Sequence, residues 1–270
     1  MLGVLVLVAL LAVGVLGLRA LGQHLFDGGQ TSSTPPPPTH VRTVRLLIPE
    51  GFAIRDIARR VPTIGLSSKS YRAAVAAAHP PPGYRATGNE RLGMEGFLFP
   101  ATYELTRPVS GKVLVAEQIE AFRRETAGVD FRYAARHGLT RYDVLIIASM
   151  IEREAAAPVD RAKISAVIYN RLRDHDLLGI DATVQYAAGS WAPVTEHDLQ
   201  RNSPYNTRKF KGLPPTPICN PGLASIEAAA HPDKVPYLYY VAIPHDPQRR
   251  HFFTASFATF NAYLSAHGLG

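Results

Sequence analysis

The sequence predicts an α+β protein built from a small α+β module and a larger mixed α+β domain, behind an N-terminal transmembrane helix. Three observations support this. The chain opens on an uncharged apolar run, a strand, turn and helix pattern begins near residue 43, and amphipathic helices with capping signals dominate after residue 109. The expected bounds are 1–20 for the anchor, 21–42 for a linker, 43–108 for the module and 109–270 for the larger domain.

The composition is globular and limits the classes of function. Of 270 residues, 46% are hydrophobic and 19% are charged, which is enough apolar material for one or two cores. The net charge of +7 favours a polyanionic partner such as nucleic acid, anionic lipid or an acidic wall polymer. No Lys/Arg run is interleaved with aromatic residues, so we expect no nucleic-acid partner. The single Cys219 excludes an intrachain disulfide and a cysteine-cluster metal site.

The first segment, Met1–Leu18, is apolar throughout. At about 1.5 Å per residue it nearly reaches the roughly 30 Å hydrocarbon thickness of a bilayer. A cleaved signal peptide is the alternative, but no basic segment precedes the run and no clear cleavage site follows it. Arg19, on the C-terminal side of the run, favours the opposite orientation, with the rest of the chain on the inner side of the membrane. A misassigned start codon that removed a basic leader would explain this. We expect an uncleaved, single-pass anchor in the cell membrane with the rest of the chain on its outer side, an orientation that rests mainly on the chemistry below.

A linker of different composition follows the anchor. Gly28-Gly29 and the Thr/Ser run at 31–34 make its first part flexible, and Pro35–Pro38 form a stiff polyproline II spacer. Such a segment separates an anchor from a folded body, as in a tethered extracellular enzyme or binder.

The module begins with a strand and a turn. Val44, Leu46 and Ile48 alternate with Thr43, Arg45 and Leu47, which is the period of a half-buried strand, and the sequence "PEG" at 49–51 turns the chain. Helical spacing of apolar residues follows up to Val61, and a second helix is expected from about Ser68. This order resembles a LysM-like module, for which a packing role and direct glycan binding both stay open.

The next stretch, residues 91–105, has the composition of a strand broken at Pro100. Glu95 and Glu104 are expected to be solvated carboxylates that flank a buried strand. A helix from about Ser110 to Thr126 follows.

The helix that follows has the strongest start signals in the chain. Thr140 and Asp143 predict a capping box, and Leu139 with Val144 has the spacing of a hydrophobic staple. Apolar residues from Val144 to Ala155 recur at the spacing of a core-facing helix.

Two glutamates lie near the end of this helix, on opposite flanks of the apolar stripe. Glu152 and Glu154 each sit roughly 80° from the stripe centre, on different sides, so they cannot act as a pair. The helix neighbours of Glu152, Ser149 among them, are small and leave room for a bulky ligand. Glu152 is therefore the candidate acid/base residue, and Glu154 is expected at the surface or in an ion pair.

After Pro158 the sequence predicts another helix, capped by Asp160, and then long loops. The loops at 203–207 and 212–222 are rich in Pro, Gly, Asn and Tyr, a composition typical of loops that line a site. A short helix at 223–230, a strand at 237–242 and a closing helix at 256–266 complete the chain.

Seven short motifs in this half of the chain form an ordered series. They are "ASMIEREA" from 148, "VIYNRL" from 167, "IDATVQYA" from 180, "SPYNT" from 203, "GLPPTPICNPG" from 212, "AAAHP" from 228 and "YLYYVA" from 237. The series resembles the YceG-like endolytic murein transglycosylases, the MltG family. The resemblance covers about Val44 to Leu264 and the anchor, and it is strongest from Ala148 to Ala242.

The resemblance implies a reaction and its catalytic residue. Such enzymes cleave the bond between N-acetylmuramic acid and N-acetylglucosamine in peptidoglycan, leave a 1,6-anhydro end and so limit the length of nascent strands. The matching catalytic residue is Glu152. Hydrolytic glycosidases use two carboxyls, whereas in an intramolecular transfer one acid protonates the leaving oxygen and later accepts the proton of the muramyl 6-hydroxyl. The glutamate must therefore carry a proton at rest, which shielding by apolar loops would favour.

The other candidate site residues are polar or aromatic members of the same motifs. Each is expected either to contact substrate or to fix a loop through hydrogen bonds, and Asp181 is the first choice for a second carboxylate. They are Ser149, Asn170, Arg171, Asp181, Thr183, Gln185, Tyr186, Tyr205, Asn206 and Asn220. No cofactor or metal is expected, since His197-Asp198 and His245-Asp246 lack a third ligand at metal spacing.

Three functions stay open from the sequence. The first is a membrane-anchored lytic transglycosylase whose partners are peptidoglycan strands and, by family analogy, the wall synthesis and division machinery. The second is a tethered peptidoglycan-binding protein without activity. The third is a lysozyme-type hydrolase of the same bond.

Overall fold

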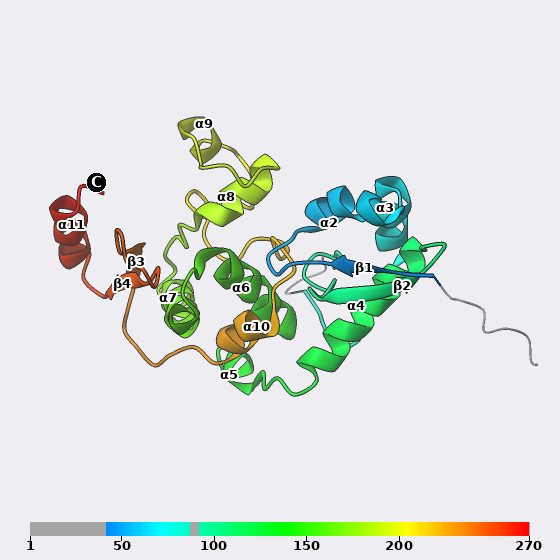
Figure 1. Ribbon diagram of the computed structural model, residues 1–270. Helices are drawn as coiled ribbons and strands as arrows, with labels where there is room; N and C mark the ends of the chain where they lie inside the picture. The colour runs from blue at the N-terminus through cyan, green and yellow to red at the C-terminus, as the bar shows by residue number, and fades with distance from the viewer. Residues whose placement is uncertain (1–41, 87–91, 270) are drawn as a thin grey trace, which may run out of the picture. The chain divides into compact units, whose positions relative to one another are not determined.

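The computed structural model describes residues 42–86 and 92–269 (Figure 1). The anchor expected at 1–20 and nearly all of the linker lie outside these residues. Within the described ranges, no helix has both the length and the apolar character needed to cross a bilayer.

The first structural unit is a two-stranded antiparallel sheet covered by short helices. Strand β1 (Thr43–Leu47) pairs with β2 (Thr102–Thr106), with Leu46 opposite Tyr103. Between them come α2 (Ile54–Arg60), η1 (Val61–Ile64) and α3 (Ser68–Ala77), and Figure 1 shows α2 and α3 beside β1. The strand, turn and two helices predicted from the sequence are confirmed. The N-cap of α3 is Ser67, one residue earlier than expected.

The remaining elements are mainly helices. They are α4 (Gly111–Thr126), α5 (Arg132–Arg136), α6 (Arg141–Glu154), η2 (Pro158–Asp160), α7 (Arg161–Arg173), α8 (Asp181–Ala188), α9 (Glu196–Leu199), α10 (Leu223–Ala230), β3 (Tyr239–Ala242), β4 (His251–Thr254) and α11 (Phe257–Ala266). Strands β3 and β4 form a second antiparallel pair. The predicted mixed α+β class is therefore confirmed, with two small sheets among the described residues.

Helix α6 lies at the centre of the core. Its predicted capping box is confirmed, because Thr140 Oγ1 accepts the Asp143 amide at 3.1 Å and Asp143 Oδ2 accepts the Thr140 amide at 2.7 Å. Every residue from Tyr142 to Ile151 is buried. Helices α7 and α10 pack against it, as Figure 1 shows. This burial fixes the orientation of the last turn, which carries Glu152.

One hydrophobic cluster joins the module to the larger domain. It contains Leu46 and Ile57 from the module together with Ile147 from α6. The loop before α10 adds backbone bonds, because the Gly51 amide donates to Asn220 O at 3.0 Å and the Asn220 amide donates to Phe52 O at 2.9 Å. The "PEG" turn is thereby fixed next to the start of α10. The domain boundary at residue 108 and the LysM-like character of the module stay predictions.

Two local expectations are wrong. The stretch 97–101 is irregular and the strand starts only at Thr102, because Asn220 binds the amides of Gly96 and Leu98 in place of a strand partner. Asp160 begins α7 without a side-chain cap bond, since its carboxylate accepts the His251 amide at 2.7 Å instead.

Candidate active site around Glu152

Glu152 lies in the last turn of α6 with one carboxyl oxygen held by the backbone. Its Oε2 accepts the Gly222 amide, the N-cap of α10, at 3.0 Å. No hydrogen bond from the described residues reaches Oε1. The side chain is partly buried. One oxygen is thus positioned while the other is left for a ligand, as a proton donor requires.

Two glycines line this carboxyl closely. An added Cβ at Gly222 would lie 1.8 Å from Glu50 Oε1, so only glycine fits there without displacing Glu50. At Gly51, where φ is +78°, a Cβ would lie 3.7 Å from the Glu152 Cγ. The two glycines thus leave room beside the Glu152 carboxyl, next to the side chains of Glu50 and Arg153.

Glu50 is a second carboxyl at this site, and the sequence interpretation missed it. It is exposed, it contacts Gly222 beside Glu152, and its pKa is raised by desolvation and then by the negative charge of Glu152. Arg161, whose Nε donates to Ser225 Oγ at 3.2 Å, opposes this and lowers the pKa of Glu50. The "PEG" turn indicated only a change of chain direction. Which helix the turn meets depends on contacts between residues 100 or more positions apart.

Glu154, expected at the surface or in an ion pair, is partly buried and forms no ion pair among the described residues. It accepts a hydrogen bond from Tyr240 Oη at 3.1 Å, and desolvation raises its pKa. It lines a cavity of about 590 Å³ with Asp181 and Arg171, on a part of the structure formed by α8 and the β3–β4 strands. The two glutamates of α6 therefore lie in separate environments, as the helix geometry predicted, and Glu154 is partly buried beside Tyr240.

Glu95 is also different from the expected solvated carboxylate. Its side chain is buried and accepts the Ile54 amide at 3.0 Å, Tyr186 Oη at 3.1 Å and Asn220 Nδ2 at 3.1 Å. Burial raises its pKa to about 7, against the lowering effect of the Ile54 amide, of Tyr186 and of Arg55. Glu95 thus joins the start of α2 to α8 and to the proline loop.

Five of the candidate substrate-binding residues are buried and hydrogen-bonded within the fold. Their partners are backbone or loop atoms: Ser149 Oγ with Ile146 O and the Ile218 amide; Asn170 with Val235 O and Tyr237 O; Thr183 with Thr207; Asn206 with Leu199 O and Arg201 O; Asn220 with Phe52 O and Glu95. These bonds match the loop-fixing alternative. Direct substrate contact by these residues stays a prediction.

The other five candidates are more exposed and lie in two groups. Arg171 and Asp181 line the cavity beside Glu154, where Asp181 pairs with Arg208, so Asp181 is not brought to Glu152. Gln185 and Tyr186 lie on α8, and Tyr205 lies in the loop after α9. Gln185 Nε2 donates to Ala192 O at 2.9 Å, and the rings of Tyr186 and Tyr205 pack with centroids 5.1 Å apart.

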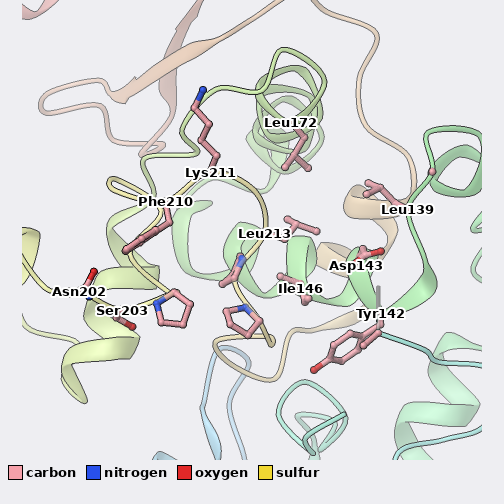
Figure 2. A pocket seen from close by; sticks show the side chains of 15 residues that line it. Leu139, Tyr142, Asp143, Ile146, Leu172, Asn202, Ser203, Phe210, Lys211 and Leu213 are labelled. Carbon is pink, nitrogen blue, oxygen red and sulfur yellow. The ribbon is translucent and has the colours of Figure 1, made fainter. Parts of the chain in front are cut away.

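The long proline-rich loops do line a cavity, as expected. Its volume is about 580 Å³, and Figure 2 shows Ile146 and Leu172 facing the loop that carries Phe210, Lys211 and Leu213. Ile146 precedes Glu152 by six residues, which is about 9 Å along the helix. This cavity therefore lies beside an earlier part of α6 than Glu152 does, and Glu152 is not among its lining residues.

The remaining reactive groups in the described ranges suggest no other chemistry. Cys219 is buried, its thiol lies 3.3 Å from Ser149 O, and burial raises its pKa well above the ordinary value, so it is not a thiolate nucleophile. No three His, Cys, Asp or Glu side chains of the described part of the chain gather in a way that would hold a metal ion.

The chain is similar to proteins of one family. The model of the YceG-like family matches residues 24–266. The endolytic murein transglycosylase of Bacillus subtilis is 42% identical over 158 residues, 57% of this chain and 43% of that protein. The protein of the same name from Streptococcus pneumoniae R6 is 34% identical over 158 residues, 56% of this chain and 28% of that protein. The chain thus spans less than half the length of these relatives. A crystal structure of a yceG-like protein from Listeria monocytogenes superposes with a TM-score of 0.69 at 31% identity and covers 81% of this chain and 75% of that one.

Proposed function

We propose, because the chain belongs to the YceG-like family, that it is a lytic transglycosylase of peptidoglycan. The bond cleaved is the one between N-acetylmuramic acid and N-acetylglucosamine, inside the strand, with a 1,6-anhydro-muramyl end as product. Such cleavage limits the length of nascent glycan strands. The names of the Bacillus and Streptococcus relatives support the reaction class.

The arrangement of Glu152 carries the proposal. Its Oε2 is fixed by the Gly222 amide, its Oε1 has no protein partner among the described residues, and the glycines Gly51 and Gly222 lie beside it. A sugar ring needs such an open flank to bring its glycosidic oxygen within hydrogen-bond reach of an acid. Glu152 is the catalytic residue of this proposal.

Glu152 alone can supply the proton that the reaction consumes and accept the proton that it releases. Glu152 Oε1 donates its proton to the glycosidic oxygen as the bond from the anomeric carbon breaks. The resulting carboxylate then takes the proton of the muramyl 6-hydroxyl, whose oxygen forms the new bond to the anomeric carbon. The nucleophile belongs to the substrate, so its effective concentration is high without an activated water.

Glu50 keeps the required proton at the site. Desolvation and then the negative charge of Glu152 raise the pKa of Glu50, so Glu50 can hold a proton beside Glu152. The buried candidates, Asn220 above all, hold the loop that presents Gly222.

Glu50 also favours a second candidate function, a lysozyme-type hydrolase of the same bond. Hydrolytic glycosidases place two carboxyls at the scissile bond, and Glu50 supplies the second one that α6 lacks. The products separate the two reactions, because transglycosylation leaves anhydro ends and hydrolysis leaves reducing ends.

Purified peptidoglycan digested with the protein and weighed by mass spectrometry tests the proposal. Anhydro-muramyl ends, 18 Da lighter than the hydrolysis product by the loss of one water, are the expected result. Reducing ends establish the hydrolase instead. No new ends establish the tethered peptidoglycan binder without activity.

The proposal includes attachment to the cell membrane. Residues 1–20 form a single-pass anchor, the Pro/Gly/Ser linker spans the distance to the wall, and the body acts on the outer side, where the glycan is. Partners are the glycan strands and the wall synthesis and division machinery. Alkaline phosphatase fused after residue 42 is active only on the outer side and tests the orientation.

A further inference from the structure

A cavity of about 500 Å³ adjoins the Glu152 site and belongs to none of the predicted motifs. It is lined by Gly51, Phe52, Asp56, Arg59, Arg60, Thr63, Arg153 and Trp191. Most of these come from the turn after β1 and from α2, and two come from the larger domain. The volume is within the usual range for a small-molecule site.

The lining carries an excess of positive charge. Three arginines face one acidic residue, Asp56, whose carboxylate already accepts the Ala53 amide and Trp191 Nε1 and lies 3.5 Å from Arg59 Nη1. Among the described residues, Arg60 and Arg153 form no ion pair. The cavity therefore presents two guanidinium groups that form no ion pair with a carboxylate of the described residues.

The cavity is held in place by stacking. The Arg153 guanidinium lies 3.9 Å from the centre of the Trp191 ring, and Trp191 Nε1 is fixed by Asp56 Oδ2 at 2.9 Å. Arg153 Nε is buried without a hydrogen-bond partner in the described ranges. A guanidinium that is already held by an aromatic ring loses little further conformational freedom when it binds an anion. The entropic cost of such a specific contact is therefore low.

The same residues join the cavity to the active site. Arg153 follows Glu152 in the sequence, and a Cβ added to Gly51 would lie 3.5 Å from Arg153 Nη1 and 3.7 Å from Glu152 Cγ. A ligand group in this cavity thus lies next to the position of the glycosidic bond at Glu152.

We propose that this cavity binds the carboxylates of the acidic stem peptide carried by the muramyl residue whose glycosidic bond Glu152 helps to break. This inference rests on the proposed function and names its substrate more closely. Guanidinium groups bind carboxylates with two parallel hydrogen bonds, and the uncharged sugar rings offer no such partner. The peptide is attached to the sugar that must lie against Glu152, so it is the anionic group nearest to the cavity.

Kinetics on two substrates test the inference. One is soluble glycan strands with their stem peptides, and the other is the same strands after amidase removal of the peptides. We expect the wild-type protein to show a KM lower by roughly fivefold to tenfold on the peptide-bearing strands. Arg60→Gln should lower the ratio of kcat/KM between the two substrates by a similar factor, through KM. Arg72→Gln, an exposed arginine on α3, is the matched control and should keep the wild-type ratio.

A binding experiment separates this inference from the proposed function. The same two strand preparations are titrated into the full chain and into Arg60→Gln by calorimetry, a readout that needs no cleavage. Tighter binding of peptide-bearing strands that Arg60→Gln abolishes supports the cavity even if no bond is cut. Cleavage with equal KM on both substrates, or an unchanged ratio in Arg60→Gln, overturns the inference and leaves the proposed function standing.

Discussion

The carboxyls of Glu50 and Glu152 meet at a single glycine: the Gly222 amide donates to Glu152 Oε2 at 3.0 Å, and the Cα of Gly222 lies against Glu50 Oε1. The two glutamates are 102 positions apart and come from the turn after β1 and the end of α6. The start of α10 therefore sets the position of both carboxyls.

Gly222→Ala should separate the two carboxyls. A Cβ at this position falls 1.8 Å from Glu50 Oε1, and because Glu50 is exposed, its side chain can move away at little cost. We expect a stability loss of less than about 1 kcal/mol and a fall in kcat of roughly tenfold. Chemical denaturation and turnover measure the two effects. Gly128→Ala, where an added Cβ meets nothing within 4 Å, should change neither. An additive loss in the Glu50→Ala, Gly222→Ala double variant would contradict the shared mechanism.

Glu50→Gln should move the alkaline side of the activity profile to lower pH. Desolvation and the charge of Glu152 raise the pKa of Glu50, so Glu50 keeps a proton at the site to a higher pH than an exposed carboxyl would. Glutamine at position 50 cannot hold that proton for the reaction, so we expect a shift of roughly half a unit to one unit. Initial rates between pH 4 and pH 9 measure it. An unchanged profile, or a shift to higher pH, contradicts the role given to Glu50.

Glu95 should make the fold less stable as pH rises. Its pKa is about 7 in the folded protein and near 4.5 when exposed, so the folded state holds the proton more tightly than the unfolded chain does. That contribution is fully present below pH 4.5 and is lost as pH rises through 7, with an upper limit of roughly 3 kcal/mol. Urea denaturation at pH 5 and pH 8 measures the change. In Glu95→Gln this part of the pH dependence should disappear, and an equal slope in both proteins would show that Glu95 does not titrate in this range.

Tyr240→Phe tests the separation of the two α6 glutamates. It removes the donor at 3.1 Å from Glu154 and leaves the surroundings of Glu152 unchanged. We expect a loss of about 1 kcal/mol of stability, and cleavage within about threefold of wild type. Thermal unfolding and turnover are the measurements. Near-complete loss of turnover in a folded variant would assign Glu154 to the reaction.

The sequence patterns predict the helices and the position of Glu152 because both depend on local residue spacing. The Thr140–Asp143 capping box and the apolar stripe of α6 are signals within one helix, and they place Glu152 on a flank beside small residues. The surroundings of Glu50 and Glu95 depend on where the Asn220 loop packs, more than 120 positions later in the chain. No periodicity within either segment carries that information. Local patterns could not predict the ion pair of Asp181 with Arg208 either, because it also joins residues that are distant in the sequence.

The most direct test of the account compares Glu152→Gln with Glu154→Gln on purified peptidoglycan. Glutamine keeps the shape of the side chain and an acceptor for the Gly222 amide, but it carries no proton for the glycosidic oxygen. Mass spectrometry of the products should show anhydro-muramyl ends with wild type and with Glu154→Gln. With Glu152→Gln we expect a loss of roughly a thousandfold or more in their rate of formation, while the fold and the binding of glycan strands persist. Full activity in Glu152→Gln would contradict the central claim.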